Sequence, residues 1–257
     1  MPESMYLTAA LDAARAAAEV IRALYRRNVA VRVKADKSPV TEADVQAERV
    51  IRQVLEERFP DHGFFGEETG SRAMDAEFVW LVDPIDGTKS FVREYPMFST
   101  QVALMRRGEL LLGVSSAPVY GEIAWAERGQ GAWLDGERLQ VSDIGDLGAA
   151  ALSAGNLGSL ARSPAWGRYG GLVARVNRIR GYGDFLHYHM LAAGKIDAVI
   201  ESDVNILDIA ALTVIVEEAG GRFTDLAGRP VALGTTSVLA TNGRLHDEIL
   251  EALQYAP

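Results

Sequence analysis

The sequence predicts an α+β or α/β protein in which two layers of helix and sheet pack together. Three observations predict this fold class. Two helical patterns open the chain, a block of strand-like runs follows them, and strands alternate with helices in the second half. The 257 residues, of which 48% are hydrophobic, can bury a substantial core. We therefore expect one large domain or two closely joined halves.

Helical patterns open the first half. Apolar residues recur at three- and four-residue spacing from Leu7 to Tyr25, which predicts a long amphipathic helix. A short strand is predicted at 29–33 and a polar loop at 34–40, and a second helix begins at Thr41. The apolar residues expected on the buried side of that second helix are Val45, Val50, Val54, Leu55 and Phe59.

Extended runs fill the rest of the first half and alternate with helices in the second. Runs at 78–82, 99–105, 109–116, 122–127 and 131–134 predict an antiparallel sheet flanked by the two early helices. In the second half strands are predicted at 150–154, 176–180, 196–200 and 237–240, and helices at 184–193, 208–218 and 245–253. The change of pattern places a junction near residue 140, with an N-terminal half at 1–140 and a C-terminal α/β half at 141–257.

Composition excludes several classes of protein. The net charge of −9 argues against non-specific binding to nucleic acid or to an anionic membrane. The absence of cysteine excludes thiolate zinc sites and phosphatases with a cysteine nucleophile. No apolar run approaches the roughly 18 residues that span a bilayer, and the amino end lacks a signal-peptide pattern, so we expect a cytoplasmic protein. His187 and His189 lie two residues apart and are expected to be structural or surface residues.

The strongest functional indication is the stretch 82–91, V-D-P-I-D-G-T-K-S-F, which follows a buried strand-like run. Asp83 and Asp86 lie three residues apart across Pro84, which is expected to turn the chain. Gly87 permits a sharp bend before a helix whose free N–H groups would face an anion. Ordinary turns also use Asp-Pro and Asp-Gly pairs. Carboxylates beside an anion-binding helix start, however, suit Mg²⁺ holding a phosphate.

Three further carboxylates stand where predicted elements end or begin. Glu67 follows a short apolar run, and a glutamate there would ordinarily serve only surface solvation. Asp44 lies three residues after Thr41 and forms a capping-box variant, which orients its carboxylate at a helix start. Asp208 stands at another predicted helix start and could simply cap it. A carboxylate held at a helix start is also well oriented for catalysis, as at Asp44. Asp208 offers a further carboxylate from the far half of the chain, and two metal ions about 3.5–4 Å apart need anionic ligands from separate segments.

Together these motifs resemble the inositol monophosphatase superfamily of Mg²⁺-dependent, lithium-sensitive phosphomonoesterases. The resemblance implies a layered α-β-α-β-α sandwich that is usually a homodimer. The matching segments are 38–44 (S-P-V-T-E-A-D), 66–68 (G-E-E), 80–88 (W-L-V-D-P-I-D-G-T), 208–211 (D-I-A-A) and 217–221 (E-E-A-G-G).

The resemblance implies a set of metal ligands. Glu67, Asp83 and the backbone carbonyl of Ile85 would hold the first Mg²⁺. Asp83, Asp86 and Asp208 would hold the second. Glu67 would also help with a third, weaker ion and so contribute to catalysis. Two or three ions per site are expected, and Mn²⁺ would also fit this donor set.

The resemblance also implies how the phosphate is attacked. Thr88 and Asp44 would orient and deprotonate the attacking water, and the N–H groups of Gly87 and Thr88 would take phosphate oxygens. Bound divalent ions lower the pKa of water and neutralise phosphate charge, so water attacks in line without a covalent intermediate. One departure is that family members commonly have Trp-Asp where this chain has Leu207-Asp208.

The segments 87–93 and 180–185 are similar to the histidinol-phosphate phosphatase branch of the family. Histidinol phosphate carries an ammonium and an imidazole, which carboxylates at Asp184 and Glu201 would bind. Glu201 also matches the family position that contacts inositol hydroxyls, and Asp184 could instead be the N-cap of the next helix. The residues expected to bind substrate are Gly87, Thr88, Lys89, Ser90, Arg180, Gly183, Asp184, Glu201 and Asp208.

Three alternatives to a histidinol phosphatase follow from the same resemblance. The first is an inositol-1-monophosphatase. The second is a nucleotidase acting on adenosine 3',5'-bisphosphate, for which Arg175, Arg178 and Arg180 could form a basic pocket for the second phosphate. The third is a non-enzymatic, transcription-associated binding protein, although such a role gives no physical reason for the complete set of acidic site groups.

Overall fold

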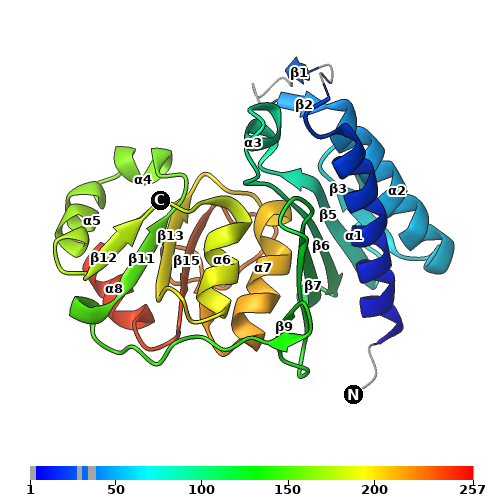
Figure 1. Ribbon diagram of the computed structural model, residues 1–257. Helices are drawn as coiled ribbons and strands as arrows, with labels where there is room; N and C mark the ends of the chain where they lie inside the picture. Colours follow the sequence, from blue (N-terminus) through cyan, green and yellow to red (C-terminus); the bar gives the residue numbers. More distant parts are fainter. Residues whose placement is uncertain (1–3, 28–30, 34–38, 257) are drawn as a thin grey trace.

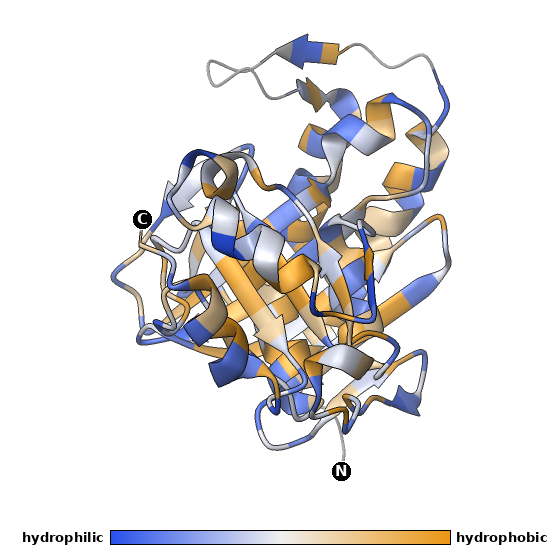
Figure 2. Ribbon diagram, turned by 90° about the vertical axis from the view of Figure 1, so that its left-hand side faces the viewer, coloured by the Kyte–Doolittle hydropathy of each residue, from blue (hydrophilic) through white to orange (hydrophobic). Residues whose placement is uncertain are grey.

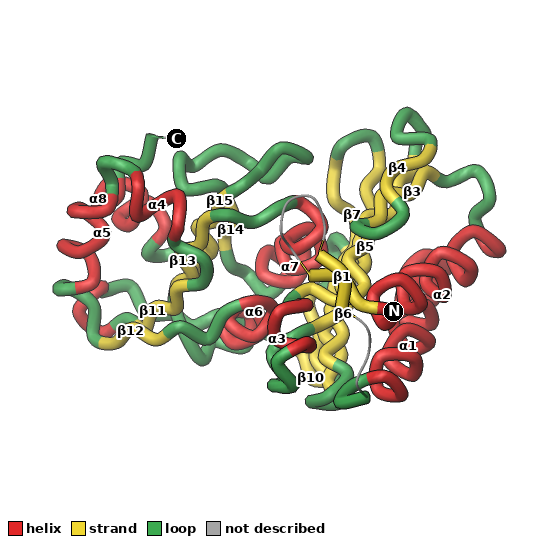
Figure 3. Tube along the Cα trace, turned by 90° about the horizontal axis from the view of Figure 1, so that it is seen from above, coloured by secondary structure: helices red, strands yellow, loops and turns green. Residues whose placement is uncertain are grey.

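The computed structural model describes residues 4–27, 31–33 and 39–256. The protein has five layers, in which three layers of helices alternate with two sheets (Figure 1). α1 and α2 cover the outer face of an eight-stranded sheet, α6 and α7 lie between that sheet and a five-stranded one, and α5 and α8 lie beyond the second sheet (Figure 3). The predicted α-β-α-β-α sandwich is confirmed.

The N-terminal half contains the larger sheet. Its strand order is β10-β9-β8-β7-β6-β5-β3-β4, and its helices are α1 (Met5–Leu24), α2 (Glu42–Arg58) and the short α3 (Thr88–Val92). A separate two-stranded ribbon pairs β1 (Val31–Val33) with β2 (Pro39–Thr41). The eight strands are β3 (Gly63–Gly66), β4 (Gly70–Arg72), β5 (Phe78–Asp86), β6 (Ser99–Arg106), β7 (Glu109–Ala117), β8 (Glu122–Glu127), β9 (Ala132–Leu134) and β10 (Glu137–Arg138).

The C-terminal half contains the smaller sheet, with strand order β12-β11-β13-β15-β14. Its strands are β11 (Ala151–Ala154), β12 (Arg178–Arg180), β13 (Ala198–Ser202), β14 (Arg222–Thr224) and β15 (Ser237–Thr241). Its helices are the 3₁₀ turn η1 (Leu147–Ala149), α4 (Gly158–Arg162), α5 (Trp166–Val173), α6 (Asp184–Ala192), α7 (Ile206–Glu218) and α8 (His246–Leu253).

Most predicted elements are present, and four expectations need correction. The first sheet is not wholly antiparallel, because β3 and β5 pair in parallel. Pro84 does not end its strand, since β5 runs on to Asp86 through a register shift between Asp83 and Asp86. The predicted strand at 29–33 needs no correction, because its described part forms β1 and residues 29 and 30 lie outside the described residues. Of the expected loop 34–40, residues 34–38 also lie outside them, and the last two belong to β2.

The fourth correction concerns the buried face of α2. Leu55 and the following Phe59 are buried as expected, but Val45, Val50 and Val54 are only half-buried. The small residues preceding Ile51 carry the contact instead, because α2 packs closely on α1 and β5. The buried side chains of α2 are Ala43, Asp44, Ala47, Glu48, Ile51 and Leu55.

A shared core joins the two halves. One cluster of buried side chains includes Val79 and Ala103 from the first sheet, Val199 from the second, and most of α7. Apolar segments accordingly gather at the centre of the molecule, and polar ones occupy its outer helices and loops (Figure 2). Because α7 is enclosed on both sides, it is apolar all round. We propose a boundary at residues 140 and 141, which separates the two sheets along the chain.

Gly113 lets α7 lie directly against the first sheet. A Cβ added at Gly113 would lie 2.3 Å from the carbonyl oxygen of Ala211 in the middle of α7. We therefore expect Gly113→Ala to lower the free energy of unfolding by about 1–3 kcal/mol. Chemical denaturation measures the effect, and Gly167→Ala, whose added Cβ meets no atom within 4 Å, is the control. Equal stability of the two variants would contradict the close approach.

Candidate metal and active site

The turn after β5 presents the first two candidate ligands. Asp83 is buried, and its Oδ1 accepts a hydrogen bond of 2.9 Å from the amide of Ile85. Gly87 then adopts a left-handed conformation, with φ of 92°, and caps α3. A Cβ at Gly87 would lie 2.6 Å from the carbonyl oxygen of Met97, so this position requires glycine for both conformation and space. The turn therefore holds both aspartates in one orientation.

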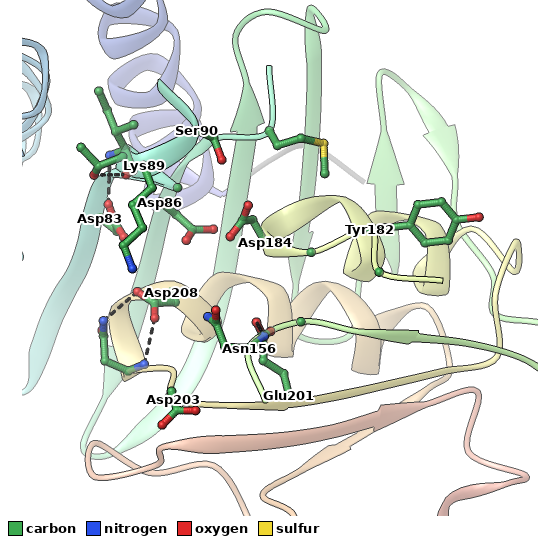
Figure 4. A pocket seen from close by; sticks show the side chains of 18 of the residues that line it. Asp83, Asp86, Lys89, Ser90, Asn156, Tyr182, Asp184, Glu201, Asp203 and Asp208 are labelled. Atoms are coloured by element: carbon green, nitrogen blue, oxygen red, sulfur yellow. Dashed lines mark hydrogen bonds between the residues drawn. The ribbon is translucent and has the colours of Figure 1, made fainter. Parts of the chain in front are cut away.

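Asp208 joins these two aspartates from the other half of the chain. One carboxylate oxygen from each of Asp83, Asp86 and Asp208 lies within 4.8 Å of the other two (Figure 4). Asp208 is the third residue of α7, and its oxygens accept bonds of 2.9 and 2.7 Å from the backbone and side-chain nitrogens of Asn205. The carboxylate thus completes a capping box and faces the cluster at once, so the structural and functional interpretations of Asp208 are compatible.

Glu67 and Ile85 lie beside this cluster as the sequence predicts. Glu67 follows β3, and its amide donates to the carbonyl of Val82 at 3.2 Å, because β3 runs alongside β5. Glu67 lines the same cavity as the three aspartates. The carbonyl of Ile85 lies 3.0 Å from Oγ1 of Thr88. All the predicted ligands are therefore brought together at one end of β5.

Charge repulsion within the cluster points to bound cations. Burial raises the pKa of Asp83 and of Asp86 well above the usual range, and the neighbouring carboxylates raise it further. Burial also raises the pKa of Asp208 to about 7, although its bonds from Asn205 act in the opposite direction. Carboxylate and carbonyl oxygens are the donors that Mg²⁺ and Mn²⁺ prefer. The donor set therefore fits divalent cations that would neutralise it.

Asp44 and Thr88 form the predicted pair. Asp44 is fully buried near the start of α2, where Oδ2 accepts bonds of 2.7 and 2.6 Å from the amide and hydroxyl of Thr41. Its Oδ1 lies 3.0 Å from Oγ1 of Thr88. Burial raises the pKa of Asp44, and the bonds from Thr41 and Thr88 offset part of that effect. A buried carboxylate bonded to a hydroxyl at the cavity edge can accept a proton relayed from water.

The C-terminal half supplies the opposite wall of a cavity of about 770 Å³. Lys89 and Ser90 line it from the first half, and Gly183, Asp184 and Glu201 line it from the second (Figure 4). Asp184 does not cap α6, because Gly183 is the N-cap and Asp184 is the first helical residue. Burial and the charge of Glu201 raise the pKa of Asp184 to about 6, while His187 and Lys89 lower it. The predicted substrate-binding carboxylates therefore face the cavity together.

A buried network fixes Glu201, and the sequence analysis missed it. Oε1 accepts a 3.0 Å bond from the amide of Asn156, and Oε2 accepts a 2.8 Å bond from the hydroxyl of Tyr188. Nε2 of His187, whose side chain is buried, lies 3.3 Å from Oε2. Burial alone would raise the pKa of Glu201, but these three groups outweigh it and lower the pKa. The spacing Asp184, His187, Tyr188 places all three on one helix face and could have indicated the network.

The residues that line the cavity differ in part from those that the sequence predicts. Asn156, Tyr182 and Asp203 line the cavity and were not named as candidates. Arg180 was named, but it is exposed at the end of β12, donates to the carbonyl of Ile179 and does not line the cavity. Arg175 instead pairs with Glu248 on α8. None of Arg175, Arg178 and Arg180 lines the cavity, so these three residues do not form in it the basic pocket expected for a second phosphate.

Comparison with known proteins decides the family. The inositol monophosphatase family model matches residues 3–257. The chain belongs to the inositol monophosphatase family. The chain is also similar to a solved structure, that of the extragenic suppressor protein suhB from Bartonella henselae. The two superpose with a TM-score of 0.89 at 30% sequence identity, over 99% of this chain and 100% of that chain.

Two curated relatives connect this inositol monophosphatase family member to phosphatase activity. A histidinol-phosphatase of Mycobacterium tuberculosis is 44% identical over 225 residues, which cover 86% of each chain. An inositol-1-monophosphatase of Caulobacter vibrioides is 36% identical over 227 residues, covering 84% of this chain and 88% of the relative. The chain is therefore a phosphoric monoester hydrolase of the inositol monophosphatase family, which is generally metal-dependent.

Leu207 is a departure from the inositol monophosphatase pattern with a local consequence. Leu207 is buried and lines a second cavity of about 400 Å³, which shares Glu67 and Asn205 with the main one. Phe65 and Leu233 also line this second cavity, so leucine at position 207, which is smaller than tryptophan, leaves apolar space beside the loop that carries Glu67.

No helix within residues 4–27, 31–33 and 39–256 is both long enough and apolar enough to cross a bilayer.

Proposed function

We propose that this chain is a Mg²⁺-dependent phosphomonoesterase whose substrate is histidinol phosphate. The observation that carries the metal-dependent hydrolysis is the meeting of Asp83, Asp86 and Asp208 beside the Asp44–Thr88 pair. When bound, divalent cations would supply charge neutralisation for the phosphate and a lowered pKa for water. Mn²⁺ would serve as an alternative to Mg²⁺.

The residues of the chain account for the remaining requirements of the reaction. Thr88 and Asp44 take the proton of the attacking water as its oxygen forms a bond to phosphorus. The ester P–O bond opposite breaks, and the alcohol leaves with a proton from solvent, so inorganic phosphate and a free alcohol result. We assign the binding of phosphate oxygens to Lys89 and the amides of Gly87 and Thr88, and the support for this is that all three residues line the cavity. With these roles, water attacks phosphorus directly and the reaction forms no covalent enzyme intermediate.

The choice of histidinol phosphate rests on the opposite wall of the cavity. Glu201 has a lowered pKa and is ionised at neutral pH, and Asp184, with a pKa of about 6, is ionised at pH 8. Two carboxylates facing the leaving group suit an alcohol that carries an ammonium group. A neutral polyol could only donate hydroxyl hydrogen bonds to them, which are weaker. The similarity to a histidinol-phosphatase supports the same substrate.

The proposal is tested by comparing three substrates. Purified protein with Mg²⁺ at pH 8 is offered histidinol phosphate, inositol 1-phosphate and adenosine 3',5'-bisphosphate, and released phosphate is measured. We expect the highest kcat/KM on histidinol phosphate and none without divalent cation. A large preference for inositol 1-phosphate, which the similarity to an inositol-1-monophosphatase favours, would overturn the substrate but leave the hydrolysis. No turnover of any of them would favour the transcription-associated binding role.

The substitution Asp184→Asn separates the two substrate classes. The variant loses a charge that faces an ammonium, and charge-assisted bonds contribute about 1.5–3 kcal/mol, so KM for histidinol phosphate should rise about 10- to 100-fold. KM for inositol 1-phosphate should change by no more than about twofold, since an amide still accepts hydroxyl bonds. Steady-state kinetics measure both, with the exposed Asp143→Asn as control. An equal rise for both substrates would contradict ammonium recognition.

A further inference from the structure

Glu48 is a fully buried carboxylate that neither the metal cluster nor the water-activating pair includes. It lies on α2 one helical turn after Asp44, so the same helix face carries two buried carboxylates. Like charges at this spacing destabilise a helix, and burial of an unbonded carboxylate costs several kcal/mol more. Two buried carboxylates on one helix face therefore need compensating hydrogen bonds. The hydrogen-bond partners of Glu48 show which part of the protein it holds.

Those partners are two backbone amides of the loop that carries Glu67. Oε2 of Glu48 accepts a 2.7 Å bond from the amide of Glu68, and Oε1 accepts a 2.7 Å bond from the amide of Thr69. The loop connects β3 to β4, whose register pairs Gly66 with Gly70. A single carboxylate therefore binds the two residues that directly follow the candidate ligand.

The backbone of β3 is shaped to admit this carboxylate. A Cβ added at Gly66 would lie 2.6 Å from both the carboxyl carbon and Oε1 of Glu48. Any larger residue at position 66 would displace the carboxylate from the two amides, and would also press on the ring of Phe64, whose Cε1 would lie 2.6 Å away. On the other side of the loop, the amide of Glu67 donates to the carbonyl of Val82 in β5 at 3.2 Å. The backbone of Glu67 is thus held from both sides, by β5 before it and by Glu48 after it.

We propose that Glu48 is a positioning residue that holds the Glu67 loop so that the Glu67 carboxylate faces the Asp83 cluster. The inference rests on the proposed metal-dependent function and assigns to α2 a second task beside that of Asp44. Glu48 does not line the cavity, and its two oxygens accept bonds from the loop amides, so we assign it no direct contact with substrate or metal. Its effect is therefore on the affinity for divalent cations, and only through that on turnover.

The test is a Mn²⁺ titration followed by electron paramagnetic resonance, which needs no substrate. Glutamine keeps one acceptor oxygen but directs an NH₂ group at the second amide. Loss of a residue that orients a ligand costs about 10- to 100-fold in metal affinity, so we expect Glu48→Gln to bind Mn²⁺ that much more weakly. Saturating Mg²⁺ should restore most of kcat, since Glu48 is outside the reacting groups.

The matched control is Asp225→Asn. Asp225 is also buried, and its Oδ1 accepts bonds of 2.9 and 2.8 Å from the amides of Ala227 and Arg229 in a loop that does not line the cavity. Both variants should melt at lower temperature, but only Glu48→Gln should lose Mn²⁺ affinity. Lower melting temperature with wild-type Mn²⁺ affinity in Glu48→Gln would overturn the positioning role.

A second variant covers the case in which Glu48→Gln does not fold. Gly66→Ala retains the carboxylate and displaces it, so it should weaken Mn²⁺ binding in the same direction, and unchanged affinity would also overturn the proposal. If the wild-type protein binds Mn²⁺ but hydrolyses no phosphomonoester, the proposed function is wrong and the positioning role of Glu48 can still be tested. If the wild-type protein binds no Mn²⁺, both the proposed function and the positioning role are wrong.

Discussion

Asp83→Asn is expected to lower kcat by about 10³-fold or more, because Asp83 is the carboxylate shared by both candidate metal positions. Cation stabilisation of a transferring phosphoryl group amounts to several kcal/mol, and each 1.36 kcal/mol is about tenfold in rate. Asparagine keeps the oxygen that accepts from the Ile85 amide, so the turn should persist. The measurement is phosphate release at saturating substrate and Mg²⁺, with Asp143→Asn as control.

The same substitution should raise the stability of the metal-free protein. The pKa values of Asp83 and Asp86 are raised in the folded state, and that of Asp208 is about 7 against an ordinary 3.8. Between these values the folded state binds more protons than the unfolded one, so the free energy of unfolding falls as pH rises from about 4 to 7. Melting curves in a chelator at pH 5 and pH 8 should show this loss in wild type and a smaller loss in Asp83→Asn.

Two outcomes would contradict the assignment of Asp83. Loss of the cooperative melting transition in Asp83→Asn would mark the residue as chiefly structural. Retained turnover in a well-folded variant would mean that the cluster does not hold the catalytic cation. Addition of Mg²⁺ should stabilise wild type at pH 8 and should stabilise Asp83→Asn much less, since ligands that bind only the folded state raise its stability.

Thr88→Val should give the second largest effect, a loss of about 10²- to 10⁴-fold in kcat, which is the usual contribution of a positioned proton acceptor. Valine is close in shape to threonine but removes the hydroxyl that lies 3.0 Å from Oδ1 of Asp44. Thr88→Ser keeps the hydroxyl and is the matched control, with a loss of about tenfold at most. Steady-state kinetics at several Mg²⁺ concentrations measure kcat and the half-saturating concentration together.

The dependence on Mg²⁺ distinguishes proton transfer from metal binding. If Thr88 acts on water, the half-saturating Mg²⁺ concentration of Thr88→Val should match that of wild type while kcat falls. If the loss disappears at high Mg²⁺, the hydroxyl serves chiefly to hold the Ile85 carbonyl, which also lies 3.0 Å from it. Equal activity of the valine and serine variants would leave Asp44 with only its capping role.

The site was more predictable than the packing around it. Local patterns placed Asp83, Asp86, Asp44 and Asp208 near strand ends or helix starts, as the structure has them. The resemblance to the family, and not those patterns, assigned the four residues to one site. The Tyr188 contact with Glu201 was not foreseen, since it joins a helix to a strand thirteen residues further on. Contacts between segments depend on topology, which local patterns do not specify.

Parts of the fold escaped prediction for similar reasons. The segment Trp166–Val173 contains three glycines, which weaken a helical pattern, yet α5 forms there because its apolar side chains pack against α8. The buried face of α2 was misplaced because large valines were preferred over alanines. Close packing on α1 favours small residues there, and the sequence of α2 alone does not show what it contacts.

The order of the site along the chain has an evolutionary consequence. Asp44, Glu67 and Thr88 precede residue 93, whereas Asp184 and Glu201 belong to a separate stretch, residues 153–203, which runs from within β11 to just past β13. Recombination that replaced residues 153–203 would change which alcohol the site accepts, and it would leave the residues proposed for hydrolysis unchanged. Chimeras between paralogues exchanged at those two points should therefore take their selectivity from the donor of the insert.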